Sequence, residues 1–154
     1  MVKGWKFLNY NGSDWKASDV ISGNYVGFVY LITFPLSDEF YIGMKQIYKG
    51  VKNVNRLKPE SLESNWVEYT SSSTTVNRKI QNGEKYEKYI LWCFPTIAAT
   101  AFCESFLICN FACGDSACLN QSIMIKTKIA KSRDMMAINK NLYYLIRSKV
   151  YGDE

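Results

Sequence analysis

Two tyrosines in one short stretch carry side chains that can do chemistry. The stretch GFVYLITFPLSDEFYIGMK, residues 27–45, places Tyr30 and Tyr41 on two apolar runs that are joined by a turn containing Pro35 and Asp38. The chain contains no histidine, which excludes Ser-His-Asp and Cys-His catalysis and His-ligated zinc. If the chain is an enzyme, its general base is therefore a tyrosine, a lysine or a carboxylate.

A carboxylate in a mostly apolar run is the second candidate. Glu104 falls within PTIAATAFCESFLICNF, residues 95–111, with Ala101 about one helical turn before it and Ile108 one turn after it. Its own face of the helix is therefore largely apolar. An ionised carboxylate is costly there unless a cation, a metal or hydrogen-bond donors meet it. Glu104 either pairs with Lys or Arg at an edge of the helix, or binds a metal or acts in catalysis.

The elements that must position these side chains follow from the residue pattern. Runs rich in aromatic and β-branched residues predict strands at 25–34, 39–45 and 85–94. Serine caps, a leading proline and an amphipathic period predict helices at 71–83, 95–111 and 134–151. Residues 46–65 are polar and are expected to be part helix and part loop. The predicted order is β-β-(loop or helix)-α-β-α, followed by a basic helical tail.

Length and composition indicate one folded domain. The 154 residues are 47% hydrophobic and 21% charged, close to the average for globular proteins. No run is long and apolar enough to span a membrane, and the N-terminus lacks the apolar stretch of a signal peptide, so we expect a cytoplasmic protein without membrane contact. The five cysteines form an odd, late cluster without a CxxC pair, and we expect reduced core residues rather than a zinc site.

The C-terminal segment is the most basic part of the chain. Residues 126–154 hold seven Lys or Arg against three acids, whereas residues 1–125 hold twelve against eleven. A basic segment at one end of a small domain is typical of contact with a polyanion. A solvated surface helix explains the charge equally well.

The polar stretch SNWVEYTSSS, residues 64–73, allows two interpretations. Trp66 and Tyr69 can stack on bases while the serines bond phosphate. Alternatively, the aromatic rings pack at the start of a helix that residues 71–73 cap, which is the interpretation we favour.

Together these features resemble the GIY-YIG nuclease family. FVY, residues 28–30, stands where the family has its first triplet, and YIG, residues 41–43, reproduces the second at hairpin spacing. A short helix, a third strand, Glu104 and then Asn120 follow in the family's order. The resemblance covers residues 25–125 and is greatest to small phage-encoded proteins of the homing-endonuclease type.

The resemblance implies a fold and a division of the chain. The fold is α/β (α+β), with a small three-stranded, mainly antiparallel sheet flanked by helices. Residues 25–125 would form the nuclease-like domain, residues 1–24 an N-terminal extension, and residues 126–154 a basic helical tail packed on the same domain.

The resemblance also implies metal-dependent hydrolysis of phosphodiester bonds in DNA by an endonuclease. Tyr30 would be the general base that deprotonates a water molecule, and Tyr41 its neighbour in the site. Glu104 would hold one Mg²⁺ or Mn²⁺, and Asn120 would orient or support the site. Because the ordinary pKa of tyrosine is about 10, nearby positive charge such as Lys45 is needed to make its proton labile.

One position of the family pattern has no clear counterpart in this chain. Members usually carry an arginine on the first helix after YIG, and the interval before SNWVEY offers Arg56 among several lysines. Arg78 on the next helix is the other choice, and failing both, Lys45 or Lys52 must take the role. An arginine suits a phosphate better because its fork donates two parallel hydrogen bonds.

DNA is therefore the expected partner. The side chains expected to contact it are Lys52, Arg78, Lys126, Lys128, Lys131 and Arg133. A specific site would need a homodimer or direct readout by the catalytic domain. Two alternatives stay open: a catalytically inactive DNA-binding protein on the same fold, favoured if the arginine is missing, and an interaction module that binds a protein through its C-terminal helix.

Overall fold

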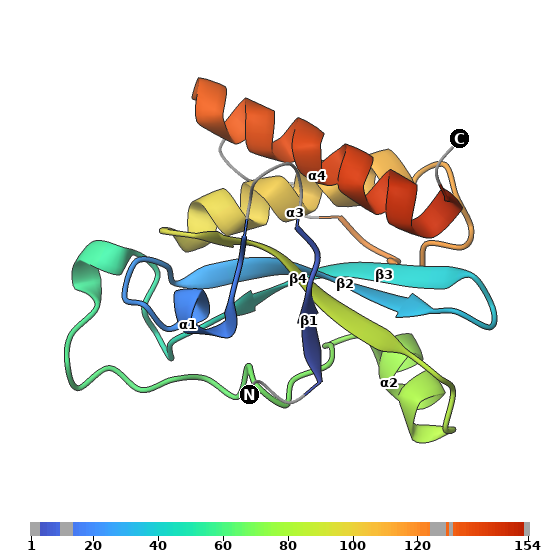
Figure 1. Cartoon of the computed structure of the whole chain (residues 1–154), viewed down its shortest axis with the longest axis horizontal. Helices are drawn as coiled ribbons and strands as arrows, with labels where there is room; N and C mark the ends of the chain where they lie inside the picture. The colour runs from blue at the N-terminus through green and yellow to red at the C-terminus, as the bar shows by residue number, and fades with distance from the viewer. Residues whose placement is uncertain (1–3, 10–13, 124–128, 130, 153–154) are drawn as a thin grey trace.

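The computed structural model describes residues 4–9, 14–123, 129 and 131–152. Its strands are β1 (Trp5–Phe7), β2 (Gly27–Phe34), β3 (Glu39–Gln46) and β4 (Glu87–Phe94). Its helices are α1 (Ala17–Val20), the short 3-10 helix η1 (Val54–Arg56), α2 (Thr74–Gln81), α3 (Ile97–Phe111) and α4 (Arg133–Tyr151). The four strands form one sheet in the order β1-β4-β2-β3 (Figure 1).

The predicted hairpin of β2 and β3 is confirmed and sets where the two tyrosines lie. The strands are antiparallel, with Tyr30 opposite Gly43 and Ile32 opposite Tyr41. Because side chains alternate between faces along a strand, Tyr30 and Tyr41 point to the same face of the sheet. At the turn, Asp38 has a φ of +56°, a conformation that aspartate adopts more readily than most residues.

The sheet differs from the expected three-stranded one because it has four strands. The additional strand, β1, comes from the segment expected to be an N-terminal extension, and it pairs in parallel with β4, with Trp5 opposite Lys88. Its three residues are too few to show the alternation by which a strand is recognised in a sequence. Trp5 is only 6% exposed, so packing against the rest of the fold holds this strand in place.

Two different layers cover the sheet. α3 and α4 lie on one face, whereas α2 and the irregular segment 47–70 lie on the other (Figure 1). Alternating residues of β2 supply both cores: Val29 and Leu31 belong to the core under α3 and α4, and Phe28 and Tyr30 to the core under the other layer. Burial on both faces explains why β2 is a continuous apolar run in the sequence.

Helices α2, α3 and α4 confirm the three predicted helices, with ends that differ by a few residues. Each begins after a side-chain cap, where Ser73, Thr96 or Ser132 accepts a hydrogen bond from a backbone N–H three residues later. The capping interpretation of the serine stretch is therefore confirmed at Ser73. Trp66 is 2% exposed and its indole Nε1 donates to Glu63 at 2.8 Å, so it packs in the core.

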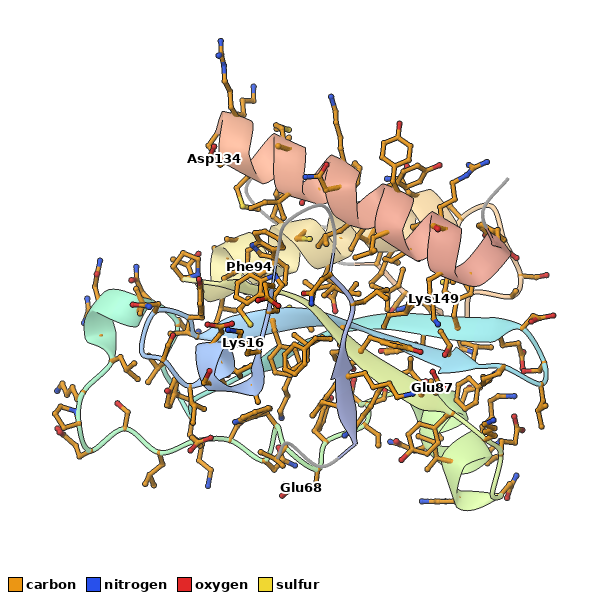
Figure 2. The ribbon with its side chains drawn as sticks, viewed as in Figure 1. Lys16, Glu68, Glu87, Phe94, Asp134 and Lys149 are labelled. Carbon is orange, nitrogen blue, oxygen red and sulfur yellow. The ribbon has the colours of Figure 1, made fainter. Side chains whose placement is uncertain are left out.

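The amphipathic pattern of α4 matches its packing. Leu142 and Ile146 are buried in the same core as the apolar face of α3. Lys149 points from α4 toward the sheet (Figure 2), with its Nζ 5.0 Å from the centroid of the Tyr89 ring. Among the described residues, no helix is long and apolar enough to cross a membrane.

The five cysteines are free thiols, but they do not all belong to the core. Cys93, Cys103 and Cys118 are buried, whereas Cys109 and Cys113 are exposed. The expectation of core packing is wrong for these two because Cys109 lies on the exposed side of α3, between buried Ile108 and Phe111, and Cys113 follows the end of that helix.

Candidate active site

The outer edge of β3 is where several of the predicted site residues meet. An edge strand leaves alternate backbone N–H groups without a strand partner, and here side chains take the partner's place. The N–H of Ile42 donates to Oδ1 of Asn120 at 2.9 Å, and the N–H of Met44 bonds the Glu104 carboxylate. Glu104 from α3 and Asn120 from the segment after α3 are thereby held beside the YIG residues.

A cavity of about 470 Å³ opens at this edge. Its wall contains Tyr41 from β3, Glu104 from α3, Asn120, and residues 72–75 at the start of α2. Segments that are far apart in the sequence therefore surround one space. The other predicted catalytic residues, Tyr30, Lys45 and Arg56, do not line it. A smaller cavity of about 260 Å³, between the hairpin and α4, contains none of the predicted site residues.

The α2 end of the cavity is polar and electropositive in character. Residues 72–75 are two serines and two threonines, of which Ser73 caps the helix. The N-terminus of a helix carries partial positive charge and unpaired N–H groups, which favour an anion. This wall therefore suits a phosphate group in the same cavity as the carboxylate of Glu104.

Tyr41 is the tyrosine that reaches the cavity. Burial raises the pKa of its phenol above the ordinary value, and the negative charge of Glu104 acts in the same direction. Hydrogen bonds with Ser71 and Ser72 act in the opposite direction. The phenol therefore stays protonated at neutral pH and is hydrogen-bonded to two serines at the start of α2.

Tyr30 lies on β2, one strand further from the edge of the sheet than Tyr41. It is 1% exposed, and its ring centroid is 6.3 Å from that of Tyr41 and 6.2 Å from that of Tyr69. Burial raises its pKa far above the ordinary value, as do Tyr69 and Tyr41 to a smaller extent, whereas a hydrogen bond with Ser71 lowers it. Ser71 thus links both phenols, and it connects buried Tyr30 to the cavity through Tyr41.

The glycines beside the tyrosines are explained by close approaches. A Cβ on Gly43 would lie 2.3 Å from the hydroxyl and Cζ of Tyr30, so the ring occupies the space that a side chain would need. A Cβ on Gly27 would lie 2.7 Å from Oγ1 of Thr100, where α3 crosses the start of β2. One glycine therefore makes room for the buried tyrosine, and the other for the helix that carries Glu104.

Glu104 is the acidic residue of the cavity wall. Burial raises the pKa of its carboxyl to about 7, with the N–H of Met44 acting in the opposite direction. The described residues contain no group of three or more His, Cys, Asp or Glu side chains that could hold a metal. A single carboxylate suits Mg²⁺ or Mn²⁺, which keep several waters and bind substrate phosphates as well, and it does not suit a structural zinc.

Asn120 supports the site through the backbone of β3. Its Oδ1 accepts from the N–H of Ile42 at 2.9 Å, and its Nδ2 donates to the carbonyl of Ile42 at 2.6 Å. The thiol of Cys118 also lies 3.3 Å from Oδ1. The amide therefore takes the place of a neighbouring strand residue and fixes the middle of the YIG triplet.

The two candidate arginines lie in different places. Arg56 is in η1, whose Val54 N–H bonds the carbonyl of Pro95 just after β4, and the colour bar places η1 at the end of the sheet far from α2 (Figure 1). Arg78 is exposed on α2, three and four residues after two threonines of the cavity wall. That spacing puts Arg78 on their face of the helix, so of the two it is closer to the cavity.

The predicted lysines are similarly divided. Lys45 is half-buried, with its Nζ 4.0 Å from the centroid of the Tyr69 ring. Burial lowers its pKa, against the effect of Glu68. Lys52 is exposed near η1, and Lys131 and Arg133 are exposed at the start of α4. The predicted contacts Lys126 and Lys128 lie outside the described residues.

Two residues of the tyrosine cluster were not expected to belong to the site. Ser71 bonds both phenols and Tyr69 packs against Tyr30. Both lie in an irregular stretch without a hydrophobic period, so the sequence carries no signal for them beyond the serines and aromatic rings of SNWVEYTSSS.

Comparison with known proteins agrees with this arrangement. A family model described as "Putative endonuclease segE, GIY-YIG domain" matches residues 8–138. No curated protein and no solved structure matches the chain. The family match spans most of the chain and contains β2, β3, Glu104 and Asn120. The chain therefore belongs to the GIY-YIG endonuclease family.

Proposed function

We propose that this protein is a metal-dependent DNA endonuclease that hydrolyses phosphodiester bonds. The observation that carries the proposal is the cavity at the edge of β3, where a tyrosine of the YIG triplet, a glutamate and the N-terminal turn of α2 line one space. These groups supply the parts that hydrolysis needs: a route for the water's proton, a carboxylate for a cation, and a positive wall for the phosphate.

Glu104 is the proposed ligand of Mg²⁺ or Mn²⁺. Its carboxyl lies on the cavity wall with a pKa of about 7, so it releases its proton readily near neutral pH when a cation binds. A bound divalent ion supplies charge stabilisation for the phosphate and the leaving oxygen. The cavity leaves space around the carboxylate for waters and phosphate oxygens, as such an ion requires.

The tyrosines are the proposed route for the proton. A water attacks phosphorus as the P–O bond to the leaving oxygen breaks, and the water gives up a proton while the leaving oxygen takes one. We assign the acceptor to the network of Tyr41, Ser71 and Tyr30, with Tyr41 nearest the water and Tyr30 as the family's general base. Because burial raises both phenol pKa values, both phenols carry their own proton, so the network accepts the water's proton only as it passes one of its own toward the leaving oxygen.

The phosphate and the DNA backbone are the proposed partners of the basic residues. Arg78 takes the arginine role because it follows the α2 wall of the cavity, and its fork suits a phosphate. Lys52, Lys126, Lys128, Lys131 and Arg133 are proposed to hold the flanking backbone. One active site hydrolyses one DNA strand at a time. Cleavage of both DNA strands therefore requires a homodimer or a second binding event.

Cleavage of supercoiled plasmid in Mg²⁺ or Mn²⁺ tests the function. Wild type is expected to give nicked circles, while Glu104→Ala and Tyr41→Phe give none at equal protein concentration. Glu60→Ala, an exposed acid in a loop, is the matched control and should cleave as wild type does. Activity in the Glu104→Ala protein would contradict the assignment of the metal ligand.

A catalytically inactive DNA-binding protein is the second candidate function. It is favoured by the position of Arg56, which lies away from the cavity. Wild type would then shift DNA in a gel with strong salt dependence while leaving long, varied DNA uncut in both metals. A protein-interaction module, by contrast, would show neither cleavage nor salt-sensitive DNA binding. A phage origin and a role in homing go with the endonuclease proposal.

A further inference from the structure

A buried lysine lies directly under the tyrosine cluster. Lys88, in β4, is 3% exposed and sits between Trp5 of β1 and Ile32 of β2 in the sheet register. A lysine in such a place is costly unless its ammonium group is met by other groups. None of the ion pairs among the described residues involves it, so backbone carbonyls and an aromatic ring do this instead.

The ammonium group of Lys88 holds the loop that precedes the cavity wall. Its Nζ donates to the carbonyl of Tyr69 at 2.7 Å and to that of Val67 at 3.3 Å, and it lies 4.3 Å from the centroid of the Trp5 ring. Burial lowers its pKa to about 8, while Glu68 acts in the opposite direction. Glu68 lies at the lower end of the view, on the side of the sheet away from α3 and α4 (Figure 2).

The loop depends on these side-chain donors. Residues 66–70 have turn or irregular backbone, so they lack the regular ladder that would fix their carbonyls. The indole of Trp5 donates to the carbonyl of Trp66 at 2.8 Å, which adds a third bond next to the two from Lys88. Two buried side chains of β1 and β4 therefore set the path of this loop.

The path of the loop decides where the ring of Tyr69 lies. The ring centroid is 6.2 Å from that of Tyr30 at an angle of 84°, and Nζ of Lys45 lies 4.0 Å from the same centroid. Tyr69 is also two residues before Ser71, which bonds the phenols of Tyr30 and Tyr41. A shift of the carbonyl of Tyr69 would therefore move the ring, whereas Ser71 is also held by Asn77, whose Nδ2 donates to its carbonyl at 2.8 Å.

We propose that Lys88 is a positioning residue of the catalytic centre, and that it acts through Tyr69. By holding the carbonyls of Val67 and Tyr69, it sets the Tyr69 ring against both Tyr30 and Lys45. The effect of Lys88 on catalysis rests on the proposed endonuclease function. Its effect on the position of the Tyr69 ring does not.

The test compares Lys88→Met, which keeps most of the aliphatic stem but removes the donor, with Leu91→Ala. Leu91 is also buried in β4 but belongs to the core on the opposite face, so its truncation destabilises the protein without touching residues 66–70. Lys88→Leu, which also removes the donor, replaces Lys88→Met if that protein does not fold, and the same results are expected of it. Both variants are measured below their melting temperatures.

The first readout is the NMR shift of the ε-methylene protons of Lys45. Because the ammonium lies over the Tyr69 ring, these protons are shifted upfield in wild type. The upfield shift should be lost in Lys88→Met and in Tyr69→Leu, and kept in Leu91→Ala. If Lys88→Met keeps it, the proposal is overturned whatever the activity shows.

The second readout is the rate of plasmid nicking. Lys88→Met should lower kcat by about tenfold with little change in KM, as expected for displaced catalytic groups, while Leu91→Ala keeps the wild-type kcat. A wild-type kcat in Lys88→Met also overturns the proposal. If wild type itself cuts no DNA, the endonuclease function fails, and the proton shifts alone decide the role of Lys88.

Discussion

The two faces of the sheet are built from different kinds of layer. α3 and α4 cover one face with regular helices, and the core there is mainly aliphatic and aromatic. The other face is covered by α2 and the irregular segment 47–70, and beneath them lie the phenol of Tyr30, the hydroxyl of Ser71 and the ammonium of Lys88. Both faces therefore bury an apolar core, and the irregular face also holds most of the candidate chemistry.

Buried polar groups behave differently on the two faces. On the helical side, the hydroxyl of Thr100 donates to Thr96 within its own helix at 2.8 Å, and Asn139 Oδ1 has no partner among the described residues. On the irregular side, Lys88 and Ser71 bond groups from other segments. Polar groups that tie segments together position a site, whereas those satisfied within one helix do not.

Glu104 is the exception, because it reaches the cavity from the helical side, and its removal should have the largest effect. Glu104→Gln is expected to lower nicking by about three orders of magnitude if it holds the metal. The same change should stabilise the metal-free protein at pH 8, because burial raises the carboxyl pKa to about 7 and ionisation in the folded state is costly.

The sign of that pH effect follows from proton linkage. The folded protein keeps the Glu104 proton to a higher pH than the unfolded chain does, so this contribution to stability is complete below the unfolded pKa and is lost as pH rises through about 7. Denaturant unfolding should therefore show equal stability for wild type and Glu104→Gln near pH 4, and a gain of about 1–3 kcal/mol for the variant at pH 8. Mg²⁺ should raise the melting temperature of wild type alone.

Gly43→Ala should have the next largest effect, and it damages the irregular face. The added Cβ would meet the Tyr30 ring at 2.3 Å, so the ring must move away from Ser71 and Tyr41. We expect a loss of about 1–3 kcal/mol of unfolding free energy and roughly a hundredfold loss of nicking. Gly114→Ala is the control, because nothing lies within 4 Å of its new Cβ.

Ser71→Ala should have a smaller effect of the same kind. It removes the hydroxyl that bonds both phenols and leaves the N–H of Ser73 without its acceptor. Nicking should fall by about tenfold, within the range for a lost proton-transfer contact. In Ser61→Ala a backbone N–H loses a similar acceptor far from the phenols, so equal losses in the two variants would contradict the proposed proton network.

The regular parts of the fold could be predicted from the sequence. The hairpin was predicted from two runs of aromatic and β-branched residues, and three helices were predicted from their caps and their apolar period. β1 could not be predicted because three residues carry no period and its stability comes from Trp5 packing on the core. The local sequence pattern was therefore enough to predict the long elements. It was not enough to predict a short element that is stabilised by tertiary contacts.

The candidate site was predictable in part for the same reason. Glu104 was singled out by its residue type on an apolar helix, and Tyr41 and Asn120 were assigned from the resemblance to the GIY-YIG family; the structure brings all three to one cavity. That Tyr41 rather than Tyr30 reaches it depends on strand order, because β3 is the edge and β2 is central. That Arg56 lies far from the cavity depends on the path of segment 47–70, which has no periodic signal.

The smallest effect on nicking is expected from damage to the helical face. Leu142 of α4 is 1% exposed and packs in the core that α3 shares, so Leu142→Ala should cost about 2–5 kcal/mol of unfolding free energy. Because no residue of α4 lines the cavity, its nicking rate well below the melting temperature should stay within about threefold of wild type. A loss of nicking as large as that of Gly43→Ala, at a temperature where both proteins are folded, would contradict this expectation. It would mean that the helical face also positions the site, because the packing of α3 would then determine where Glu104 meets Met44.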